Sequence, residues 1–191
     1  LTAVNNLTKR CIWLDKGHLK GIGYTKEMIR QYTSSLEKSL VFNAKASQNK
    51  PAITKVELLT SEGNGLHAYG KPLSVLFEIT MPQENMTDMA LSFQVFNQMN
   101  QPVHYNWIFD YEKTVFRKKG GNLVVFTFDK LKLFKGQYYL KVHLAETKRK
   151  KKYQETDCCF FSVEMIDIPE PQWGWNEGVC QVLEEGKWDI R

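Results

Sequence analysis

The chain has 191 residues, 42% of them hydrophobic and 13% aromatic, which is enough apolar material for the core of one ordinary domain with an appendage, or of two small domains. Its 26 Lys and Arg against 21 Asp and Glu give a formal net charge of +5, a weaker excess than a dedicated nucleic-acid-binding protein carries. Four cysteines without CxxC spacing or a nearby histidine pair argue against a zinc site and a disulfide framework, and no apolar run approaches the ~20 residues of a membrane span, so we expect a soluble, cytoplasmic chain.

The first predicted element is a β-hairpin followed by one helix. An apolar strand ends at Leu14, a turn occupies residues 15–17, and a second short strand ends near Gly23. Thr25 is a favourable N-cap for the helix. One side of that helix is apolar and contains Met28, Ile29, Tyr32 and Leu36. A hairpin and one helix bury too little surface to be stable alone, so we expect this segment to complete a larger domain or to pack on the next one.

The rest of the chain predicts a linker and an all-β domain. Residues 33–51 are largely polar and end at a proline, which is a linker composition. Residues 52–191 predict an immunoglobulin-like or jelly-roll antiparallel β-sandwich of about eight strands, because β-branched and aromatic segments alternate with turn residues. The predicted strands are residues 53–60, 72–80, 89–99, 103–111, 122–130, 137–146, 157–165 and 178–185.

Alternation of apolar and polar residues assigns one side of each predicted strand to the core. A sandwich buries these sides between its two sheets and leaves the other sides exposed. The predicted core consists of Leu73, Val75, Phe77, Ile79, Leu91, Phe93, Val95, Val124, Phe126, Phe128, Tyr138, Leu140, Val142 and Leu144.

Residues Gly65–Pro72 resemble the loop that binds phosphate in nucleotide-binding proteins. Gly65, Gly70 and Lys71 match its pattern, but Pro72 stands where the pattern needs Ser or Thr, whose hydroxyl would hold magnesium. Such a loop must also lead into a helix whose first N–H groups meet the phosphates, whereas a strand pattern follows here. We interpret the stretch as a Gly-rich connection between two strands.

Lys148–Lys152 is a run of basic residues between two predicted strands. A nucleic-acid patch can have this composition, but a charged hairpin tip is a common way to keep a sheet edge soluble. We favour the hairpin tip and expect no nucleic-acid partner. A weak attraction to anionic lipid headgroups or anionic sugars stays open.

The last predicted strand, residues 178–185, follows a break at Pro169 and Pro171, so its tether to the sheet is weak. A strand on such an arm can pair with a second chain. The tryptophans around it, which could fill such a joint, are Trp173, Trp175 and Trp188. We therefore predict a homodimer, with exchange of the C-terminal strand as a candidate arrangement.

The N-terminal hairpin and helix are similar to the end of an ABC-transporter ATPase domain. The matching positions are Val4, Leu7, Cys11, Ile12, Leu14, Gly17, Ile22, Gly23 and Tyr32. The resemblance covers residues 1–32 and implies that the ATPase motifs precede Leu1. It therefore implies that ATP and magnesium bind outside this chain, which would hold no cofactor or metal of its own and would not be an enzyme.

The ATPase-like tail and the linker are followed, in this order, by segments 56–63, 72–80, 92–103, 133–142 and 178–188 of the predicted β-sandwich. This combination resembles the Wzt family, the ATP-binding subunits of O-antigen polysaccharide exporters. It implies that residues 52–191 recognise the non-reducing end of an O-antigen polysaccharide at the cytoplasmic face of the bacterial inner membrane, with the transmembrane subunit as a partner. The aromatic stretch 104–113 departs from the small polar residues expected there, which indicates either a glycan preference of this chain or a different loop.

Side chains suited to sugars lie on the predicted strands, on the side away from the core. Sugars bind to flat aromatic faces beside amides, carboxylates and cations that satisfy their hydroxyls. The candidate carbohydrate-binding residues are Gln94, Phe96, His104, Asn106, Trp107, Tyr139, Lys141 and His143. We expect Trp107 to lie where its strand gives way to an irregular segment and to act as a stacking platform. The alternatives are a core or corner role for Trp107, and a merely solvated strand side for Lys141 and His143.

Other functions fit parts of the sequence. A structural module could hold an ATPase pair together by strand exchange and bind no glycan. A glycan-modifying enzyme would need paired carboxylates, but Asp110 and Glu112 fall in the expected irregular segment and Asp129 ends a strand. His67 and His104 have no further ligand at a fixed spacing, which argues against a metal site.

Overall fold

The computed structural model describes residues 4, 7–35, 39–84, 86, 88–108, 116, 118–172, 174–176, 178–184, 186 and 189. Its elements are β1 (Arg10–Asp15), β2 (His18–Tyr24), α2 (Thr25–Ser35), β3 (Val41–Asn43), β4 (Ala52–Leu59), β5 (Leu66–Ala68), β6 (Leu73–Met81), β7 (Met89–Asn97), β8 (Pro102–Ile108), β9 (Gly120–Phe128), β10 (Gly136–Glu146) and β11 (Lys151–Glu164). Within the described residues, no helix has both the length and the apolar character that a membrane span requires.

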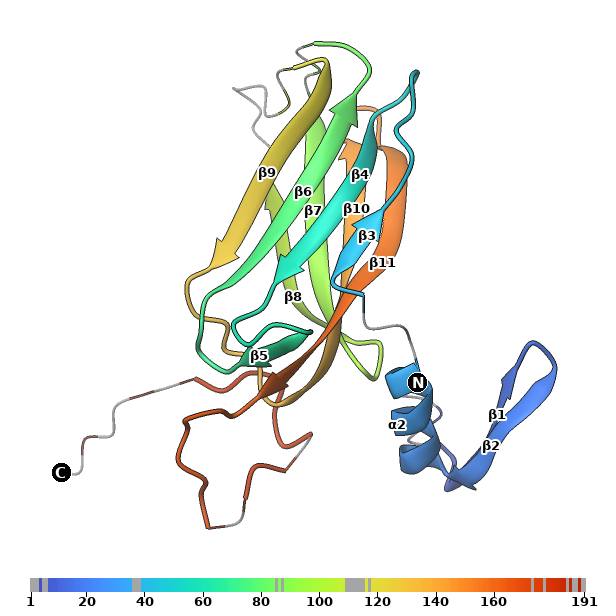
Figure 1. The fold of residues 1–191 in the computed structure, drawn as a ribbon, viewed down its shortest axis with the longest axis vertical. Helices are drawn as coiled ribbons and strands as arrows, with labels where there is room; N and C mark the ends of the chain where they lie inside the picture. Colours follow the sequence, from blue (N-terminus) through green and yellow to red (C-terminus); the bar gives the residue numbers. More distant parts are fainter. Residues whose placement is uncertain are drawn as a thin grey trace.

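Two sheets packed face to face form a β-sandwich, which confirms the predicted fold class (Figure 1). The four-stranded sheet has the order β3-β4-β6-β9, and the five-stranded sheet has the order β5-β11-β10-β7-β8. Neighbouring strands are antiparallel except β5, which runs parallel to β11. A separate two-stranded sheet, β1-β2, precedes the sandwich.

The structure differs from the predicted strands in two short strands and in the C-terminal segment. The short strands β3 and β5 were not predicted, and β3 lies inside the segment expected to be a linker. Residues 178–185 do not form a regular strand in their described part. Val182 makes only an isolated bridge with Leu133 of the same chain. A strand of three residues is too short to show alternation of apolar and polar side chains, so the sequence pattern did not predict β3 or β5.

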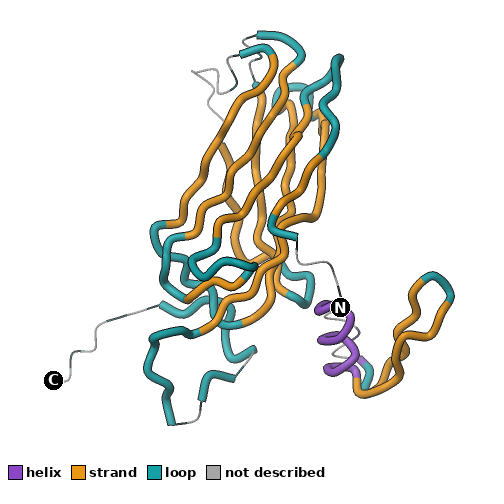
Figure 2. Tube along the Cα trace, viewed as in Figure 1, coloured by secondary structure: helices purple, strands orange, loops and turns teal. Residues whose placement is uncertain are grey.

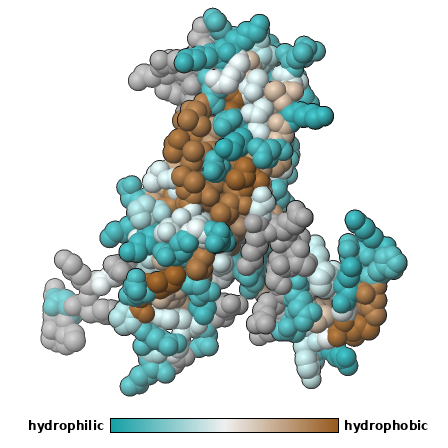
Figure 3. All heavy atoms as spheres, in the orientation of Figure 1, coloured by the Kyte–Doolittle hydropathy of each residue, from teal (hydrophilic) through white to brown (hydrophobic). Residues whose placement is uncertain are grey.

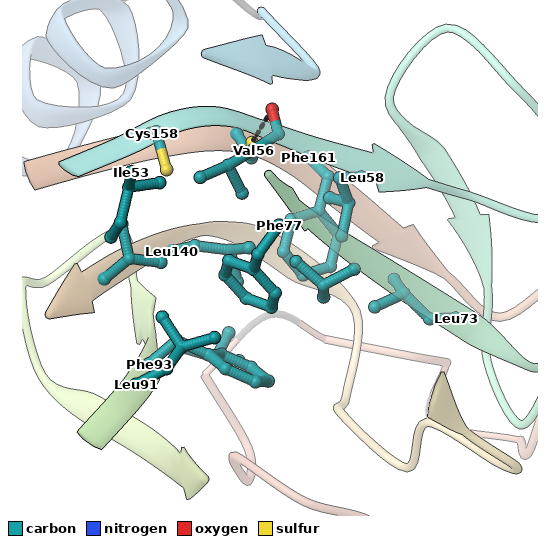
Figure 4. Close-up of a cluster of buried hydrophobic side chains, with 14 of the residues drawn as sticks. Ile53, Val56, Leu58, Leu73, Phe77, Leu91, Phe93, Leu140, Cys158 and Phe161 are labelled. Carbon is teal, nitrogen blue, oxygen red and sulfur yellow. Dashed lines mark hydrogen bonds between the residues drawn. The ribbon is translucent and has the colours of Figure 1, made fainter. Parts of the chain in front are cut away.

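The core lies between the two sheets, and the predicted core residues are all found in it or packed against it (Figure 4). Phe77 is 1% exposed, and its ring centroid lies 5.7 Å from that of Phe93 on the facing sheet. Phe126 and Phe128 of β9 are partly buried, and each makes an edge contact with the Phe93 ring. Burial of these side chains holds the sheets at a fixed separation, and the outward side chains are thereby fixed in position.

The hairpin and helix of the N-terminal segment are present as predicted (Figure 2). Helix α2 covers one face of the hairpin, where Met28 approaches the backbone so closely that a Cβ on Gly21 would lie 2.9 Å from its sulfur. The Trp13 ring makes an edge contact with the Tyr32 ring at 5.8 Å. The other face of the hairpin exposes the apolar side chains of Ile12, Leu14, Leu19 and Ile22. Leu36, predicted to extend the apolar side of the helix, lies outside the described residues.

The stretch Gly65–Pro72 is a strand connection, as we interpreted it. It contains β5 and leads into β6 at Leu73, not into a helix. His67 is fully buried and braces the connection, because its Nδ1 accepts a hydrogen bond from Ser61 N–H at 3.1 Å and its Nε2 lies 3.2 Å from the Lys71 carbonyl oxygen. Burial lowers the pKa of His67, so the neutral ring that this geometry needs is favoured.

The C-terminal segment, meaning the described residues after β11, returns to the end of the sandwich where β6 begins. Leu183 N–H donates to the Lys132 carbonyl at 3.0 Å, and the Tyr69 hydroxyl donates to the Leu183 carbonyl at 2.7 Å. The Trp175 ring packs on Phe134 at 5.8 Å. Trp173 and Trp188, which we predicted to surround an exchanged strand, lie outside the described residues. Strand exchange therefore stays a prediction.

Candidate functional site

The candidate site is the side of the five-stranded sheet that faces away from the four-stranded sheet, here called the outer face. Every second residue of β7, β8 and β10 points to it. The pairs that lie opposite each other on this face are Ser92 with His143 and Trp107, Gln94 with Lys141 and Tyr105, and Phe96 with Tyr139. Because directly opposite residues of an antiparallel pair share a face, the register alone places these side chains together.

Three stacked rings cross the outer face from β7 through β10 to β11. We call Phe96, Tyr139 and Phe160 the aromatic ladder. The Tyr139 ring stacks on Phe96 at 5.4 Å and on Phe160 at 5.3 Å, with interplanar angles of 20° and 27°. Both ring faces of Tyr139 are therefore covered, and the ladder presents edges and a hydroxyl to solvent. That hydroxyl donates a hydrogen bond to the Asn100 side chain.

Burial, with a smaller contribution from the charge on Asp157, raises the pKa of Tyr139 to about 12. The phenol is therefore neutral at physiological pH and keeps its proton for hydrogen bonding. Lys141 lies beside it with its ammonium 4.8 Å from the centre of the Phe96 ring, a cation–π contact that fixes the lysine over the ladder.

A row of polar side chains continues from the ladder across the same face. We call Gln94, Lys141, His143, Glu155 and Asp157 the polar strip. Lys141 Nζ lies 3.5 Å from an Asp157 carboxylate oxygen. His143 Nε2 lies 3.3 Å from Gln94 Oε1, and His143 Nδ1 lies 3.5 Å from Glu155 Oε2. The strip thus offers an amide, an ammonium, an imidazole and two carboxylates on neighbouring strands, in two contact groups: Lys141 with Asp157, and His143 with Gln94 and Glu155.

Burial lowers the pKa of His143, and the nearby Glu155 opposes this effect. The hydrogen bond from Lys152 lowers the pKa of Glu155, so that carboxylate stays ionised. The strip therefore combines fixed charges of both signs with a neutral imidazole near pH 7. Such a set can donate and accept hydrogen bonds at neighbouring points.

Two exposed aromatic rings border the strip on β8. We call Tyr105 and Trp107 the edge pair. Their side chains are 55% and 56% exposed, and their ring centroids lie 5.3 Å apart. β8 is the edge of its sheet among the described strands, so no further described strand pairs with it beside the two rings. The edge pair, in contrast to the ladder, can offer ring faces to a ligand.

The structure brings six of the eight predicted site residues to the outer face and sends two to the other side. His104 and Asn106 lie opposite Val95 and Phe93, so they point toward the core. The His104 ring packs at 5.4 Å from Phe128, and burial lowers the pKa of His104. The Asn106 side-chain nitrogen is buried without a hydrogen-bond partner among the described residues.

A β-bulge explains this correction. The register of β7 and β8 shifts between Val95 and Phe96, so that β8 has an extra residue, Val103, at this point. The extra residue decides which residues of β8 point to the outer face. Tyr105 and Trp107 consequently point outward. Trp107 is the penultimate residue of β8, which ends at Ile108, and the expected irregular segment after it falls on residues 109–115, outside the described residues. The sequence pattern alone fits either side of β8 pointing outward, because both sides contain aromatic or amphipathic residues.

Sequence reasoning missed Tyr105, Glu155, Asp157 and Phe160. The last three belong to β11, where a second bulge near Cys158 and Cys159 changes which residues point outward. Asp110 and Glu112, considered as an acidic pair, lie outside the described residues. Within the described part of the chain, no group of three or more His, Cys, Asp or Glu is arranged to hold a metal ion.

The arrangement as a whole suits a flat ligand with apolar C–H groups on its faces and hydroxyls around its rim. The edge pair can stack on the C–H groups. The polar strip can exchange hydrogen bonds with several hydroxyls at once, and its charged members make those bonds stronger than neutral ones. The ladder supplies a rigid floor, since each of its rings is held by its neighbours.

Comparison with known proteins gives one family. The sequence model of the family described as "Wzt C-terminal domain" matches residues 44–181. A comparison with curated protein sequences finds no match.

Several solved structures resemble this chain at low sequence identity. The crystal structure of the C-terminal domain of wzt has 10% identity and a TM-score of 0.46, over 68% of this chain and 79% of that one. The β-glucuronidase of Parabacteroides merdae has 12% identity and a TM-score of 0.32, over 68% of this chain and 13% of that one. The alkylpurine DNA glycosylase AlkC of Pseudomonas fluorescens, bound to DNA with an abasic-site analogue, has 9% identity and a TM-score of 0.34, over 73% of this chain and 38% of that one.

Proposed function

Because this chain belongs to the Wzt C-terminal domain family, we propose that it is a carbohydrate-binding module that recognises the non-reducing end of an O-antigen polysaccharide for export by an ABC transporter. The proposed site is the outer face of the five-stranded sheet. Binding is the whole task of this chain in the proposal. ATP hydrolysis, with its magnesium ion, belongs to the ATPase domain whose last part residues 1–32 resemble.

The observation that carries the proposal is the polar strip between two aromatic groups. A terminal sugar ring would lie against the edge pair of Tyr105 and Trp107, while Gln94, Lys141 and His143 bind its hydroxyls. Each of these strip residues is already held by a neighbour, so little side-chain entropy is lost when the sugar binds. A surface ordered before the ligand arrives can discriminate one sugar from another by the positions of its hydroxyls.

The proposal includes partners. The chain would work at the cytoplasmic face of the bacterial inner membrane, beside the transmembrane subunit of the transporter. It would also act as a homodimer. The C-terminal segment supports this part, because its hydrogen bonds with Lys132, Phe134 and Tyr69 and its bridge with Leu133 are contacts that a second copy of the same segment could make equally well.

Titration with purified O-antigen polysaccharides tests the function. Trp107 is the exposed tryptophan of the site, so a cognate polysaccharide should quench tryptophan fluorescence to saturation. Tyr105→Ala should weaken binding about fivefold or more, since truncation of an aromatic hot-spot residue costs more than about 1 kcal/mol. Tyr24→Ala is the matched control, because Tyr24 is also exposed but lies on the N-terminal hairpin.

Each outcome separates the proposal from its rival. Saturable binding that Tyr105→Ala weakens and Tyr24→Ala leaves unchanged supports the carbohydrate-binding face. A dimeric chain that shows no saturable response to any polysaccharide supports the structural module instead. Equal effects of the two tyrosine substitutions would remove the outer face as the site while leaving the fold intact.

A further inference from the structure

A hollow, here called the end hollow, lies among the connections at one end of the sandwich. In Figure 1 this is the end where β4 begins and β6 ends. Three connections meet there: the segment between β3 and β4, the described part of the segment between β6 and β7, and the turn between β10 and β11. The hollow measures about 500 Å³. Figure 3 shows that hydrophilic residues gather at this end of the molecule. Loops at the end of a rigid sandwich are common places for binding sites.

Positive charge exceeds negative charge around this end hollow. Its charged lining consists of Lys50, Lys148, Arg149 and Lys151, with Asp88 and Glu146. The four cations outnumber the two carboxylates. The cations lie at the rim, where the side chains of Lys148 and Arg149 are 72% and 80% exposed, while those of Asp88 and Glu146 are only 14% and 12% exposed. A ligand entering from solvent would therefore meet the cations first.

The two carboxylates position the cations. Lys148 Nζ lies 3.0 Å from Asp88 Oδ1. Arg149 approaches Glu146 with its Nε, at 3.3 Å, so this contact does not use the two terminal nitrogens of the guanidinium. Those nitrogens form the planar fork that binds a phosphate or a carboxylate through two parallel hydrogen bonds. The turn itself is anchored, because Thr147 donates from its N–H and its hydroxyl to the Asp88 carbonyl at 2.7 and 3.0 Å.

The rest of the lining suits a sugar. The Tyr153 hydroxyl donates to Glu146 at 3.0 Å, and Lys151 Nζ lies 4.9 Å from the centre of the Tyr153 ring, so both side chains are held in place. Asn49 and Gln83 supply amides that can bind hydroxyls. A second hollow of about 460 Å³ shares Pro82 with the first and has Lys119 in its lining, so a ligand longer than one sugar could extend across both.

We propose that the end hollow is a second binding site, for an acidic saccharide unit that carries a carboxylate or a phosphate. The Arg149 fork and Lys50 bind the acidic group, and the amides bind the hydroxyls of the same unit. The basic run Lys148–Lys152 is therefore more than a solvated hairpin tip. That the acidic unit belongs to the exported polysaccharide rests on the proposed function, whereas the site itself does not.

Binding of small acidic sugars to the full chain tests the site. The probes are glucuronate and glucose 6-phosphate, with uncharged glucose as the reference, followed by two-dimensional amide NMR. Saturable shifts should appear in the turn between β10 and β11 for the two acidic probes and not for glucose. Raising sodium chloride from 50 to 300 mM should weaken binding, because rim charges are screened.

Two variants and a control locate the contacts. Arg149→Gln should weaken binding of both acidic probes about tenfold. Lys50→Gln should weaken it as well, and this variant leaves no carboxylate without its cation, because Lys50 has no ion-pair partner among the described residues. Lys130→Gln removes the same charge from an exposed position at the opposite end of β9 and should bind like the unmodified chain.

The outcomes are distinct. Acidic probes that bind no better than glucose, or Lys50→Gln and Arg149→Gln variants that bind like Lys130→Gln, would overturn the proposal. So would binding to phosphatidylglycerol vesicles without binding to either soluble acidic sugar, since that result assigns the basic end to a membrane surface. Tyr105→Ala should leave acidic-probe binding unchanged. If the polysaccharide titration fails while the acidic probes still bind, the proposed function is wrong and the second site stands.

Discussion

Replacing Phe77 by alanine tests whether the side chains between the two sheets form the core that stabilises the sandwich. Phe77 is 1% exposed and lies on β6, with its ring 5.7 Å from Phe93 of the facing sheet. Loss of a fully buried phenylalanine costs about 3–5 kcal/mol, through lost burial and the cavity left behind. For a domain of this size, that loss lowers the melting temperature by roughly 6–20 °C.

Leu123→Ala is the matched control, since Leu123 lies on the neighbouring strand β9 but is 65% exposed on the opposite side of the sheet. Substitution at such a surface position usually changes the free energy of unfolding by less than about 0.5 kcal/mol. Urea unfolding followed by tryptophan fluorescence and by circular dichroism measures both variants. If Phe77→Ala leaves too little folded protein, Phe77→Leu provides a milder perturbation in the same direction. Equal losses at Phe77 and Leu123 would refute the assignment of inner and outer sides.

The remaining predictions concern pH and two polar anchors. Burial lowers the pKa of three histidines, His67, His104 and His143. The unfolded chain therefore binds more protons than the folded one below about pH 6.5. The urea concentration at the unfolding midpoint should decrease when the pH is lowered from 8 to 5.5, and an increase would contradict the lowered histidine pKa values. Asn97→Ala should cost about 1–3 kcal/mol in urea unfolding, because this 5% exposed amide accepts from two backbone N–H groups of the turn after β7, and a neutral result would show that the turn does not need it. Tyr69→Phe removes the 2.7 Å bond to Leu183 and should speed hydrogen exchange in residues 181–184 while β10 stays protected; unchanged exchange would show that this bond does not hold the C-terminal segment.

The sequence predicts the sandwich well because its long strands alternate clearly. Leu73, Val75, Phe77 and Ile79 recur at every second position of β6, and all four are buried. The pattern also predicts the turn residues between strands and the hairpin with its helix. These features depend on neighbours within a few residues, which a single sequence records directly.

The site is predicted less completely because it depends on which residues of distant strands lie opposite each other. His104 and Trp107 differ by an odd number of positions, so they must point to opposite sides of β8, and only the bulge at Val95 and Phe96 decides which side is outward. Phe160 and Asp157 join the site through the register of β10 and β11, which has bulges of its own. Pairing between strands depends on residues far apart in the sequence, so a local pattern does not predict it.

The most direct test of the central claim is to map where a cognate O-antigen polysaccharide contacts the protein, by amide and side-chain NMR shifts during titration. The outer-face account predicts saturable shifts at Gln94, Tyr105, Trp107 and His143, with little change on the outward side of the four-stranded sheet. Shifts centred instead on Leu76, Leu123 and Val125 of that other sheet, or no saturable shifts with any polysaccharide, would contradict it.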